Sequence, residues 1–405
     1  MNEVRALIEA FDAANKRGER CALATVVSVE GSSYRRPGAR MLVCEGGKST
    51  GTISAGCLES DVIEHAKRVI KTSVAKLVEY NTASTSDEMA WGLGLGCNGI
   101  VRVLVELLAP SSLYIETLRC SCEASASPVL VATLYQHTPS ESARDAARIE
   151  TGARLFINEY GDISREKLNE RVAAVLESEV RARDLSLGGE TSGARTYDVD
   201  GGAVKVFVET LLPPVPLIVF GAGHDALPVV ELARSLGWQT EVVDTQARHA
   251  SLSRFAMADR VTLSRPEDMA AQIRITARTL TLLMTHNYSQ DLELLRFLLN
   301  SPARYIGVMG PRKRTERMLN ELATAEDTSR LDETDLARLH SPAGLDIGAN
   351  SPAEIALSII AEMRAVLAGR RGRMLRERRG SIHGGAGDGE RVPLTEAEVM
   401  PVAVA

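Results

Sequence analysis

Two cysteines of the N-terminal half lie in glycine-containing loops, where a thiol could act as a nucleophile, a persulfide carrier or a soft-metal ligand. Cys57 directly follows residues 51–56 (GTISAG), where a predicted strand gives way to a predicted helix whose free N–H groups would favour a thiolate. Cys97 ends the alternating glycines of residues 92–97 (GLGLGC). We therefore predict a shared site with Cys57 and Cys97 as catalytic residues and Cys57 as a candidate metal ligand. The alternative for each is the small buried hydrophobic residue that free cysteine usually forms.

Two adjacent arginines occupy a polar loop of the same half. Arg35 and Arg36 lie within residues 31–38 (GSSYRRPG), between two predicted strands. A guanidinium group can grip a phosphate or a carboxylate through two parallel hydrogen bonds, so the pair suits an anionic ligand. The alternative is a solvated pair of surface charges.

A second basic cluster opens a helix in the C-terminal half. A predicted strand ends before Gly310, Pro311 takes the first helical position, and Arg312, Lys313 and Arg314 fill the first turn. Cations oppose the helix dipole at this end, so the sequence indicates an anion bound there. The alternative is a solvated basic turn.

Residues 216–244 have the pattern of a nucleotide-binding unit. An apolar strand, 217–220, leads into a glycine turn with Gly221, Gly223 and His224, and then into an amphipathic helix. A second strand ends on Asp244, about twenty residues further on, where an acid suits a ribose hydroxyl. This order predicts a Rossmann-type unit; the alternative is a βαβ unit that merely turns on glycines.

His286 lies at the carboxyl end of a predicted strand, 279–285, and ligands of open α/β sheets bind at that edge. It could contact a ligand, or it could belong to a helix cap with Asn287. The residues predicted to bind a cofactor are Arg35, Arg36, Gly221, Gly223, His224, Asp244, His286, Arg312, Lys313 and Arg314.

Bulk composition limits the function classes. The chain of 405 residues suggests two or three domains, and 44% apolar residues allow sizeable cores. A net charge of −6 and only 4% aromatic residues argue against a nucleic-acid partner. Six cysteines show no zinc-like spacing, no apolar run is long enough to span a membrane, and the N-terminus lacks the features of a signal peptide. We expect a cytoplasmic protein.

The fold class predicted is α/β, with an N-terminal mixed α/β domain followed by a Rossmann-like domain with a parallel sheet. The predicted divisions are an N-terminal domain at 1–212, a proline-rich linker at 213–216, the Rossmann-like domain at 217–369 and a basic, then disordered, tail at 370–405. Predicted helices are 2–17, one beginning at Cys57, 110–126, 164–183, 227–236, 266–274, 288–299, 311–324 and 352–368. Predicted strands are 21–29, 39–44, 50–54, 74–80, 100–108, 128–136, 155–158, 196–199, 204–211, 217–220, 241–243, 260–263, 279–285 and 304–308.

Several of these stretches together resemble the XdhC/CoxI family, maturation factors of molybdenum hydroxylases such as xanthine dehydrogenase and carbon monoxide dehydrogenase. The resemblance covers most of residues 1–369, with two departures: the family usually has glycine at Ala55 and often aspartate at Asn287. The matching motifs are GSSYRRPGARMLV at 31–43, GTISAGCLESDV at 51–62, GLGLGCNG at 92–99, LIVFGAGHDALP at 217–228, MTHNYSQDLELL at 284–295, YIGVMGPRKRTERML at 305–319 and GLDIGANSPAEIALSIIAEM at 344–363.

The resemblance implies a maturation chaperone rather than a turnover enzyme. It implies binding of the molybdenum cofactor, as molybdopterin or its cytosine dinucleotide form, sulfuration with a cysteine desulfurase, and delivery to an apo-subunit of a molybdenum hydroxylase. In this interpretation Gly221, Gly223 and the basic turn at 312–314 hold the phosphate end, while Cys57 and Cys97 lie near the metal or receive sulfur. Arg35 and Arg36 would then meet the pterin or a phosphate. A homodimer is plausible.

Two other functions fit parts of the sequence. An NAD-dependent oxidoreductase would explain Asp244, because an acid there suits the ribose of NAD and repels the phosphate of NADP. The N-terminal half, however, has no obvious hydride-transfer constellation. A non-catalytic adaptor with a vestigial Rossmann domain is the other alternative.

Overall fold

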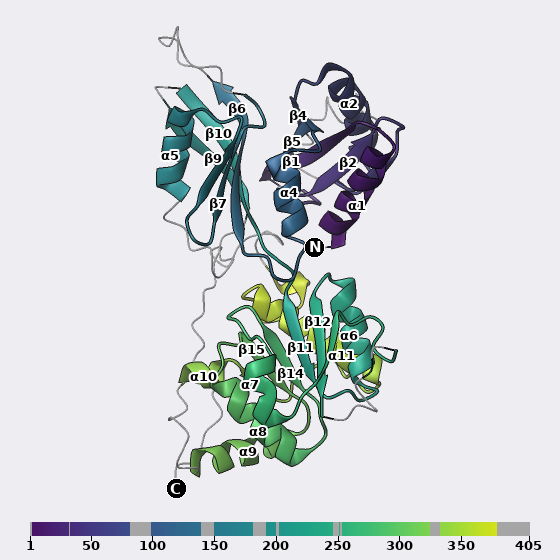
Figure 1. Cartoon of the computed structure of the whole chain (residues 1–405), viewed down its shortest axis with the longest axis vertical. Helices are drawn as coiled ribbons and strands as arrows, with labels where there is room; N and C mark the ends of the chain where they lie inside the picture. The colour runs from purple at the N-terminus through teal and green to yellow at the C-terminus, as the bar shows by residue number, and fades with distance from the viewer. Residues whose placement is uncertain are drawn as a thin grey trace. The chain divides into compact units, whose positions relative to one another are not determined.

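The structure is a computed structural model, and it describes residues 2–31, 33–81, 99–138, 150–180, 192–199, 202–245, 251, 253–324 and 333–378. The chain divides into two compact units, Met1–Pro213 and Pro214–Ala405 (Figure 1). Each unit is built around its own sheets and cores. The N-terminal unit contains antiparallel sheets and the C-terminal unit a parallel one, so the predicted mixed α/β domain followed by a Rossmann-like domain with a parallel sheet is confirmed.

The first sheet of the N-terminal unit has five strands in the order β3-β2-β1-β5-β4, and its neighbouring strands run antiparallel. Helix α2 packs on one face and buries Val62, Ala66, Val69 and Ile70, the spacing of a single helical stripe. The elements are α1 (Asn2–Lys16), β1 (Cys21–Gly31), β2 (Arg40–Cys44), β3 (Ser49–Gly51), α2 (Glu59–Thr72), β4 (Lys76–Asn81) and β5 (Gly99–Leu108).

The second sheet repeats this topology. Its order is β8-β7-β6-β10-β9, again antiparallel, with α5 packed against one face. Helix α4 (Leu113–Cys120) connects the two sheets in sequence. The elements of the second sheet are β6 (Val129–Thr138), β7 (Arg154–Asn158), β8 (Ile163–Glu166), α5 (Glu170–Val180), β9 (Gly193–Val199) and β10 (Gly202–Leu211).

The sequence carries the same repeat, although it was not predicted. Strand β5 reads GIVRVLVELL and β10 reads GAVKVFVETL, while β2 and β7 both begin at the arginine of a Gly-Ala-Arg tripeptide, at 38–40 and 152–154. Each first strand also breaks register at one place, between Val26 and Ser28 in β1 and opposite the Lys205/Val206 step in β6. Two copies of one β-β-β-α-β-β arrangement therefore make up the N-terminal unit.

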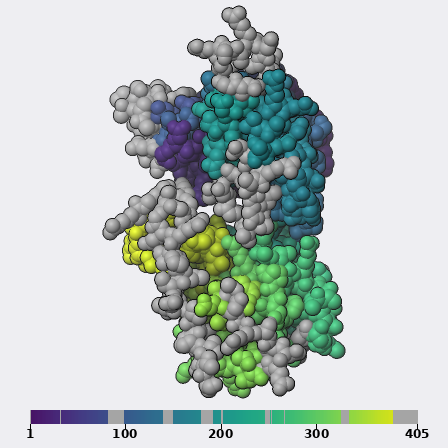
Figure 2. Space-filling view, turned by 90° about the vertical axis from the view of Figure 1, so that its left-hand side faces the viewer, coloured from purple at the N-terminus to yellow at the C-terminus, as the bar shows by residue number. Residues whose placement is uncertain are grey.

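The C-terminal unit is a six-stranded parallel sheet in the order β13-β12-β11-β14-β15-β16. Alternate residues of β11 serve two cores, because successive side chains point to opposite faces. Leu217 and Val219 pack with α6 and α11, whereas Ile218 and Phe220 pack with α8 and α9. Helix α11 also packs directly against α6. In Figure 2 the yellow part of the chain borders the green surface of the same unit.

The strands of this unit are β11 (Pro216–Phe220), β12 (Gln239–Asp244), β13 (Arg260–Leu263), β14 (Leu280–Leu283), β15 (Tyr305–Val308) and β16 (Leu339–His340). Its helices are α6 (Ala226–Ser235), η1 (Pro266–Asp268), α7 (Met269–Gln272), α8 (Tyr288–Leu299), α9 (Arg312–Thr324), α10 (Glu333–Ala337), α11 (Pro352–Leu367) and η2 (Leu375–Glu377). Among the described residues, every helix is too short or too polar to span a membrane.

Several predicted elements were wrong in kind or extent. The helix expected at 164–183 begins as strand β8, since Ile163–Glu166 pairs with β7, and α5 starts only at Glu170. The helix expected at 110–126 is confined to α4, and the one expected to begin at Cys57 starts at Glu59. The elements α10 and β16 were not predicted. Most of the predicted basic, then disordered, tail, residues 379–405, lies outside the described residues.

Candidate functional site

The glycine turn of the C-terminal unit lies at the carboxyl edge of the parallel sheet. It follows β11, whose neighbours β12 and β14 continue the sheet in opposite directions, so the turn sits at the topological switch point where such sheets bind ligands. Gly221 has φ +112°, and a Cβ there would lie 2.4 Å from the carbonyl oxygen of Met284. Only glycine fits this close approach of two strands.

Asp244 ends β12 beside that turn. Its Oδ2 accepts a hydrogen bond of 2.8 Å from the backbone N–H of Ala222, in the middle of the glycine turn. The carboxylate thus holds the turn in shape, a role that was not predicted. The prediction that Asp244 binds a ribose is not tested by this contact.

An acid–histidine pair occupies the start of α6. The carboxylate of Asp225, the N-cap residue, lies against Gly223 and contacts Nε2 of His286 at 2.7 Å. His286 has φ +58° and its side chain is 63% exposed. The paired carboxylate therefore lies at the helix end that favours anions. His224 lies in the same turn.

The basic turn at the start of α9 divides into two parts. Arg314 contacts the buried carboxylate of Asp291 at 2.6 Å, and that carboxylate also accepts a hydrogen bond of 2.6 Å from Thr285. The Arg314 ion pair therefore joins α9 to α8, and Asp291 connects both to Thr285, just after β14. Arg312 and Lys313 are exposed, and within the described part of the chain neither shows an ion pair. These two residues supply the charge that remains available to an anion.

The Cys57 loop, residues 52–58, is organised by Ser54 and Glu59. The Glu59 carboxylate accepts hydrogen bonds from the backbone N–H groups of Ile53 and Ser54 and from the Ser54 hydroxyl. Ser54 Oγ in turn accepts from the N–H groups of Gly56 and Leu58. Cys57, half-buried, lies at the tip of this network, two residues before α2 begins. Burial alone would raise the pKa of Glu59, but these hydrogen bonds outweigh it and hold that pKa below its ordinary value.

Replacing Glu59 with glutamine should loosen the Cys57 loop. The amide lacks the charge that the three donors stabilise, so we expect a loss of about 1–2 kcal/mol in the free energy of unfolding and faster alkylation of Cys57. A carboxyl whose pKa is lowered on folding contributes stability above its unfolded pKa and loses it as pH falls through the lowered folded pKa, so the wild-type advantage should shrink as pH falls below about 4.3. Urea unfolding at pH 7 and at several lower pH values measures the advantage; one that does not shrink with falling pH would contradict this assignment.

Three loops singled out by sequence leave the first sheet at the same edge. In register, Gly31 of β1 faces Gly99 of β5, Met41 of β2 faces Gly51 of β3, and Asn81 of β4 faces Ile100. The described strand ends that flank segments 32–39 and 82–98, and the strand end before 52–58, therefore lie along one border. Cys97 and residues 92–98 lie outside the described residues, so the predicted pairing of Cys57 with Cys97 stays a prediction.

The contacts of the two adjacent arginines leave their predicted binding of an anion untested. Arg35 forms two hydrogen bonds with the carboxylate of Glu3 in α1, at 2.5 and 3.0 Å. Arg36 accepts a hydrogen bond at its carbonyl from Ala39 N–H, which closes the loop before β2. An anion would compete with Glu3 for Arg35.

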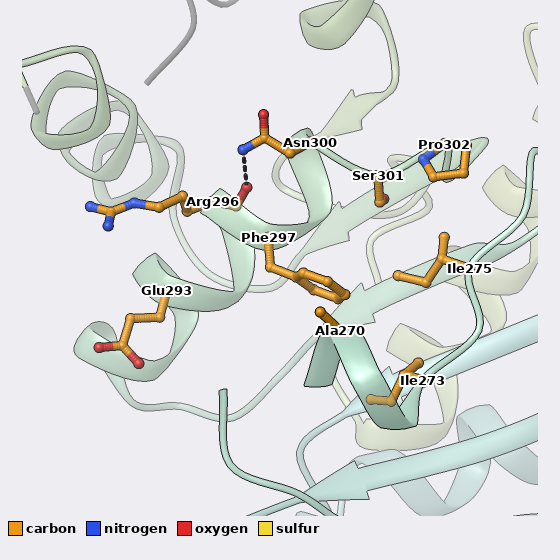
Figure 3. Close-up of a pocket in the computed structure, with 9 residues that line it drawn as sticks. All are labelled: Ala270, Ile273, Ile275, Glu293, Arg296, Phe297, Asn300, Ser301 and Pro302. Carbon is orange, nitrogen blue, oxygen red and sulfur yellow. Dashed lines mark hydrogen bonds between the residues drawn. The ribbon is translucent and has the colours of Figure 1, made fainter. Parts of the chain in front are cut away.

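A cavity of the C-terminal unit lies away from these residues. It has a volume of 530 Å³ and is lined by α7 and the segment after it, and by α8 and the segment after it, including Ile273, Phe297 and Ser301 (Figure 3). Helix α8 begins at the carboxyl edge with Asn287 as N-cap and runs toward the opposite edge. The cavity is thus at the far end of α8 from the glycine turn.

Sequence reasoning missed Ser54, Glu59, Asp225 and Asp291. A Ser-x4-Glu pair flanking a cysteine loop, and an acid shortly after Gly-x-Gly, are signals that could have indicated the first three. Asp291 could not be recognised, because its partners Thr285 and Arg314 are brought to it only by the packing of α8 and α9.

Comparison with known proteins agrees with both units. The family profile described as the XdhC Rossmann domain matches residues 217–363, and that of the XdhC and CoxI family matches residues 14–81. This chain belongs to the XdhC and CoxI family. A Bacillus subtilis protein described as a probable subunit of xanthine dehydrogenase is 29% identical over 354 residues, covering 87% of this chain and 95% of that protein.

Two further relatives of the XdhC chain are informative. A crystal structure described as a xanthine dehydrogenase from Bacillus halodurans matches with a TM-score of 0.69 and 29% identity, covering 90% of this chain and 97% of that one. The Escherichia coli protein YqeB is 29% identical over 232 residues, which cover 56% of this chain and 41% of that protein. The first of these shows that the fold recurs in a relative over most of the chain.

Proposed function

We propose that this XdhC-family protein is a chaperone that binds the molybdenum cofactor, supports its sulfuration and delivers it to a molybdenum hydroxylase. The family is associated with the maturation of xanthine dehydrogenase, so we propose an enzyme of this class as the partner. The single observation that carries the proposal is the glycine turn at the switch point of a family-matched Rossmann domain, with the exposed cations Arg312 and Lys313 on the same sheet edge.

The residues present at the Rossmann edge fit the phosphate end of such a cofactor. At Gly221 the turn passes so close to Met284 that a Cβ would strike its backbone carbonyl. The first N–H groups of α6 and the two cations Arg312 and Lys313 favour an anion. When bound, the cofactor would supply a molybdenum centre able to exchange an oxo for a sulfido ligand.

The chain's own residues would then bind the cofactor and orient it. Gly221 and Gly223 shape the turn that would receive the phosphate, Asp244 keeps that turn in shape through Ala222, and His286 contacts the carboxylate of Asp225. Cys57 is the candidate to receive sulfur from a cysteine desulfurase, in a loop that Glu59 holds. We place the protein in the cytoplasm, with the apo-hydroxylase and the desulfurase as partners and a homodimer as its assembly.

Reversing the charge of Arg312 and Lys313 should weaken cofactor binding. The Arg312→Glu and Lys313→Glu double variant places carboxylates beside the ligand phosphate, so we expect Kd to rise about tenfold or more and its salt dependence to fall. Equilibrium binding of molybdopterin under anaerobic conditions at two salt concentrations measures this. The control is Arg317→Glu on the same helix, where Arg317 pairs with Glu321 at 3.0 Å. An unchanged Kd in the double variant would remove the basic turn from the site.

The direct test of the function is activation of an apo-hydroxylase. We expect purified protein loaded with cofactor, together with a cysteine desulfurase and a sulfur donor, to activate the apo-enzyme faster than free cofactor does. Equal rates with and without the protein would reject the chaperone. In that case NADH turnover would indicate the oxidoreductase, and its absence the adaptor.

A further inference from the structure

The two copies of the repeat are joined by a reciprocal pair of buried ion pairs. Arg40 begins β2 of the first copy and contacts Glu209 of β10 in the second, at 2.5 Å. Arg154 begins β7 of the second copy and contacts Glu106 of β5 in the first. All four side chains are at least nine-tenths buried, and each glutamate holds the same place in the sequence match between β5 and β10.

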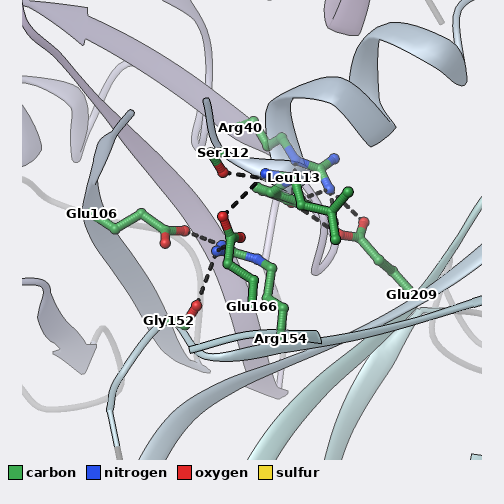
Figure 4. A network of polar contacts seen from close by, with 9 residues as sticks. Arg40, Glu106, Ser112, Leu113, Gly152, Arg154, Glu166 and Glu209 are labelled. Atoms are coloured by element: carbon green, nitrogen blue, oxygen red, sulfur yellow. Dashed lines mark hydrogen bonds and ion pairs between the residues drawn. The ribbon is translucent and has the colours of Figure 1, made fainter. Parts of the chain in front are cut away.

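Tyr114 of α4 lies between the two arginines. Its hydroxyl accepts hydrogen bonds from Arg40 and donates one of 3.0 Å to Glu209, while the guanidinium of Arg154 stacks 3.8 Å from its ring centroid. Figure 4 shows both arginines and both glutamates in this network. Around it, each copy contributes a matching apolar pair to one small core, Val27 with Leu104 and Tyr135 with Phe207.

The backbone around each arginine is also the same. The Arg40 guanidinium donates to the carbonyl of Gly38 at 2.8 Å, and the Arg154 guanidinium donates to that of Gly152 at 3.0 Å. Each of these glycine N–H groups donates to the first strand of its own copy, to Val26 in one case and to Leu134 in the other, at 2.8 Å. The two positions are therefore structurally equivalent.

The connections beyond the arginines differ between the two copies. In the first copy β3 leads to the Cys57 loop, residues 52–58, and β4 to residues 82–98. In the second copy the corresponding connections are only 167–169 and 200–201 and contain no cysteine. Of the two copies, only the first contains the candidate site residues of the N-terminal unit.

Arg40 contacts the residues that border two loops of the first copy, the arginine loop and the Cys57 loop. Its guanidinium holds Gly38 at the end of the arginine loop, and its backbone carbonyl lies so close to Gly51 that a Cβ there would approach it to 2.4 Å. Gly51 is the last residue before the Cys57 loop. Arg40 therefore joins the ion pair between the copies to residues next to both loops.

We propose that the N-terminal unit is an internal duplication in which the second copy holds the Cys57 loop of the first copy in position. Arg40 and Glu209, which form the ion pair between the copies, are the positioning residues for this loop. This rests on the assignment of Cys57 under the proposed function. Alkylation of the Cys57 thiol reports on the loop without any cofactor, so the positioning proposal and the proposed function can fail separately.

The duplication supplies its own matched control. In the full-length protein, Arg40→Met with Glu209→Gln removes both charges of one ion pair, and Arg154→Met with Glu106→Gln removes both charges of the equivalent pair. We would measure the rate at which iodoacetamide alkylates Cys57, by peptide mass spectrometry, with the exposed Cys120 as internal reference. Thermal unfolding of both variants reports their global stability.

We expect the Arg40 and Glu209 variant to speed alkylation of Cys57 about fivefold, because the loop opens more often, and the Arg154 and Glu106 variant to change it less than about twofold. Equal acceleration by both, or no acceleration by the first, would overturn the proposal. If the first variant does not fold, Arg40→Lys, which keeps the charge and loses the fork, should accelerate alkylation where Arg154→Lys does not. Normal hydroxylase activation by a Cys57→Ser protein would reject the role of Cys57 and leave the positioning result standing.

Discussion

Cys57→Ser should leave the fold intact and reduce hydroxylase activation by about tenfold or more, equivalent to ~1.4 kcal/mol or more of lost transition-state stabilisation. A serine hydroxyl fills nearly the same space in the half-buried loop but cannot carry a persulfide. Ser54 and Glu59 hold the loop through backbone N–H groups, so their hydrogen bonds do not depend on the Cys57 thiol. We therefore expect an unchanged unfolding temperature.

The measurement is the rate at which an apo-hydroxylase gains activity with the variant as cofactor donor. Cys120→Ser is the matched control, since Cys120 is exposed in α4, outside the loops at the edge of the first sheet. Wild-type activation by the Cys57 variant would exclude this thiol from sulfur transfer.

The second large effect is expected from Gly221→Ala. At φ +112° an alanine is strained, and its Cβ would lie 2.4 Å from the carbonyl oxygen of Met284, a backbone atom that cannot rotate away. We expect roughly 3 kcal/mol or more of destabilisation and a fall of roughly 10 °C in the unfolding transition of the C-terminal unit, together with loss of ligand binding. Calorimetry of the full chain measures it.

Gly223→Ala should distinguish an effect on ligand binding from an effect on the stability of the fold. A Cβ at Gly223 would meet the Asp225 side chain rather than backbone, so the carboxylate can move aside at small cost in stability. Ligand binding should nevertheless change, since Asp225 and its partner His286 lie at the start of α6. Equal destabilisation by the two alanines would show that the two glycines do not differ in this way.

Local patterns predicted much of the fold. The glycine turn, the strand before it and the helix after it occur where the sequence places them, because apolar periodicity and glycine act over a few residues. The start of α2 was misplaced, because the hydrogen bonds of Glu59 keep Cys57 outside the helix. Strand β8 was taken for helix, because its pairing partner β7 decides its conformation.

Contacts between distant elements also limited what the sequence could predict about the candidate sites. Arg314 could not be distinguished from Arg312 and Lys313 by sequence, since its partner Asp291 is on another helix. Asp244 was assigned to a ligand, and its contact with the Ala222 N–H depends on two strands meeting. The duplication, by contrast, was readable from the parallel runs GIVRVLVELL and GAVKVFVETL and needed only a comparison of the chain with itself.

The central claim is that the protein holds a molybdenum-bound pterin rather than a nicotinamide. The most direct test is to load the purified chain anaerobically with molybdenum cofactor, remove free ligand, release bound pterin with acid and oxidant, and quantify its fluorescence. We predict retention of pterin by the wild-type chain, reduced retention in the Arg312 and Lys313 charge-reversal variant, and no turnover of NADH. NADH turnover with a carbonyl substrate, in a protein that retains no pterin, would contradict this claim.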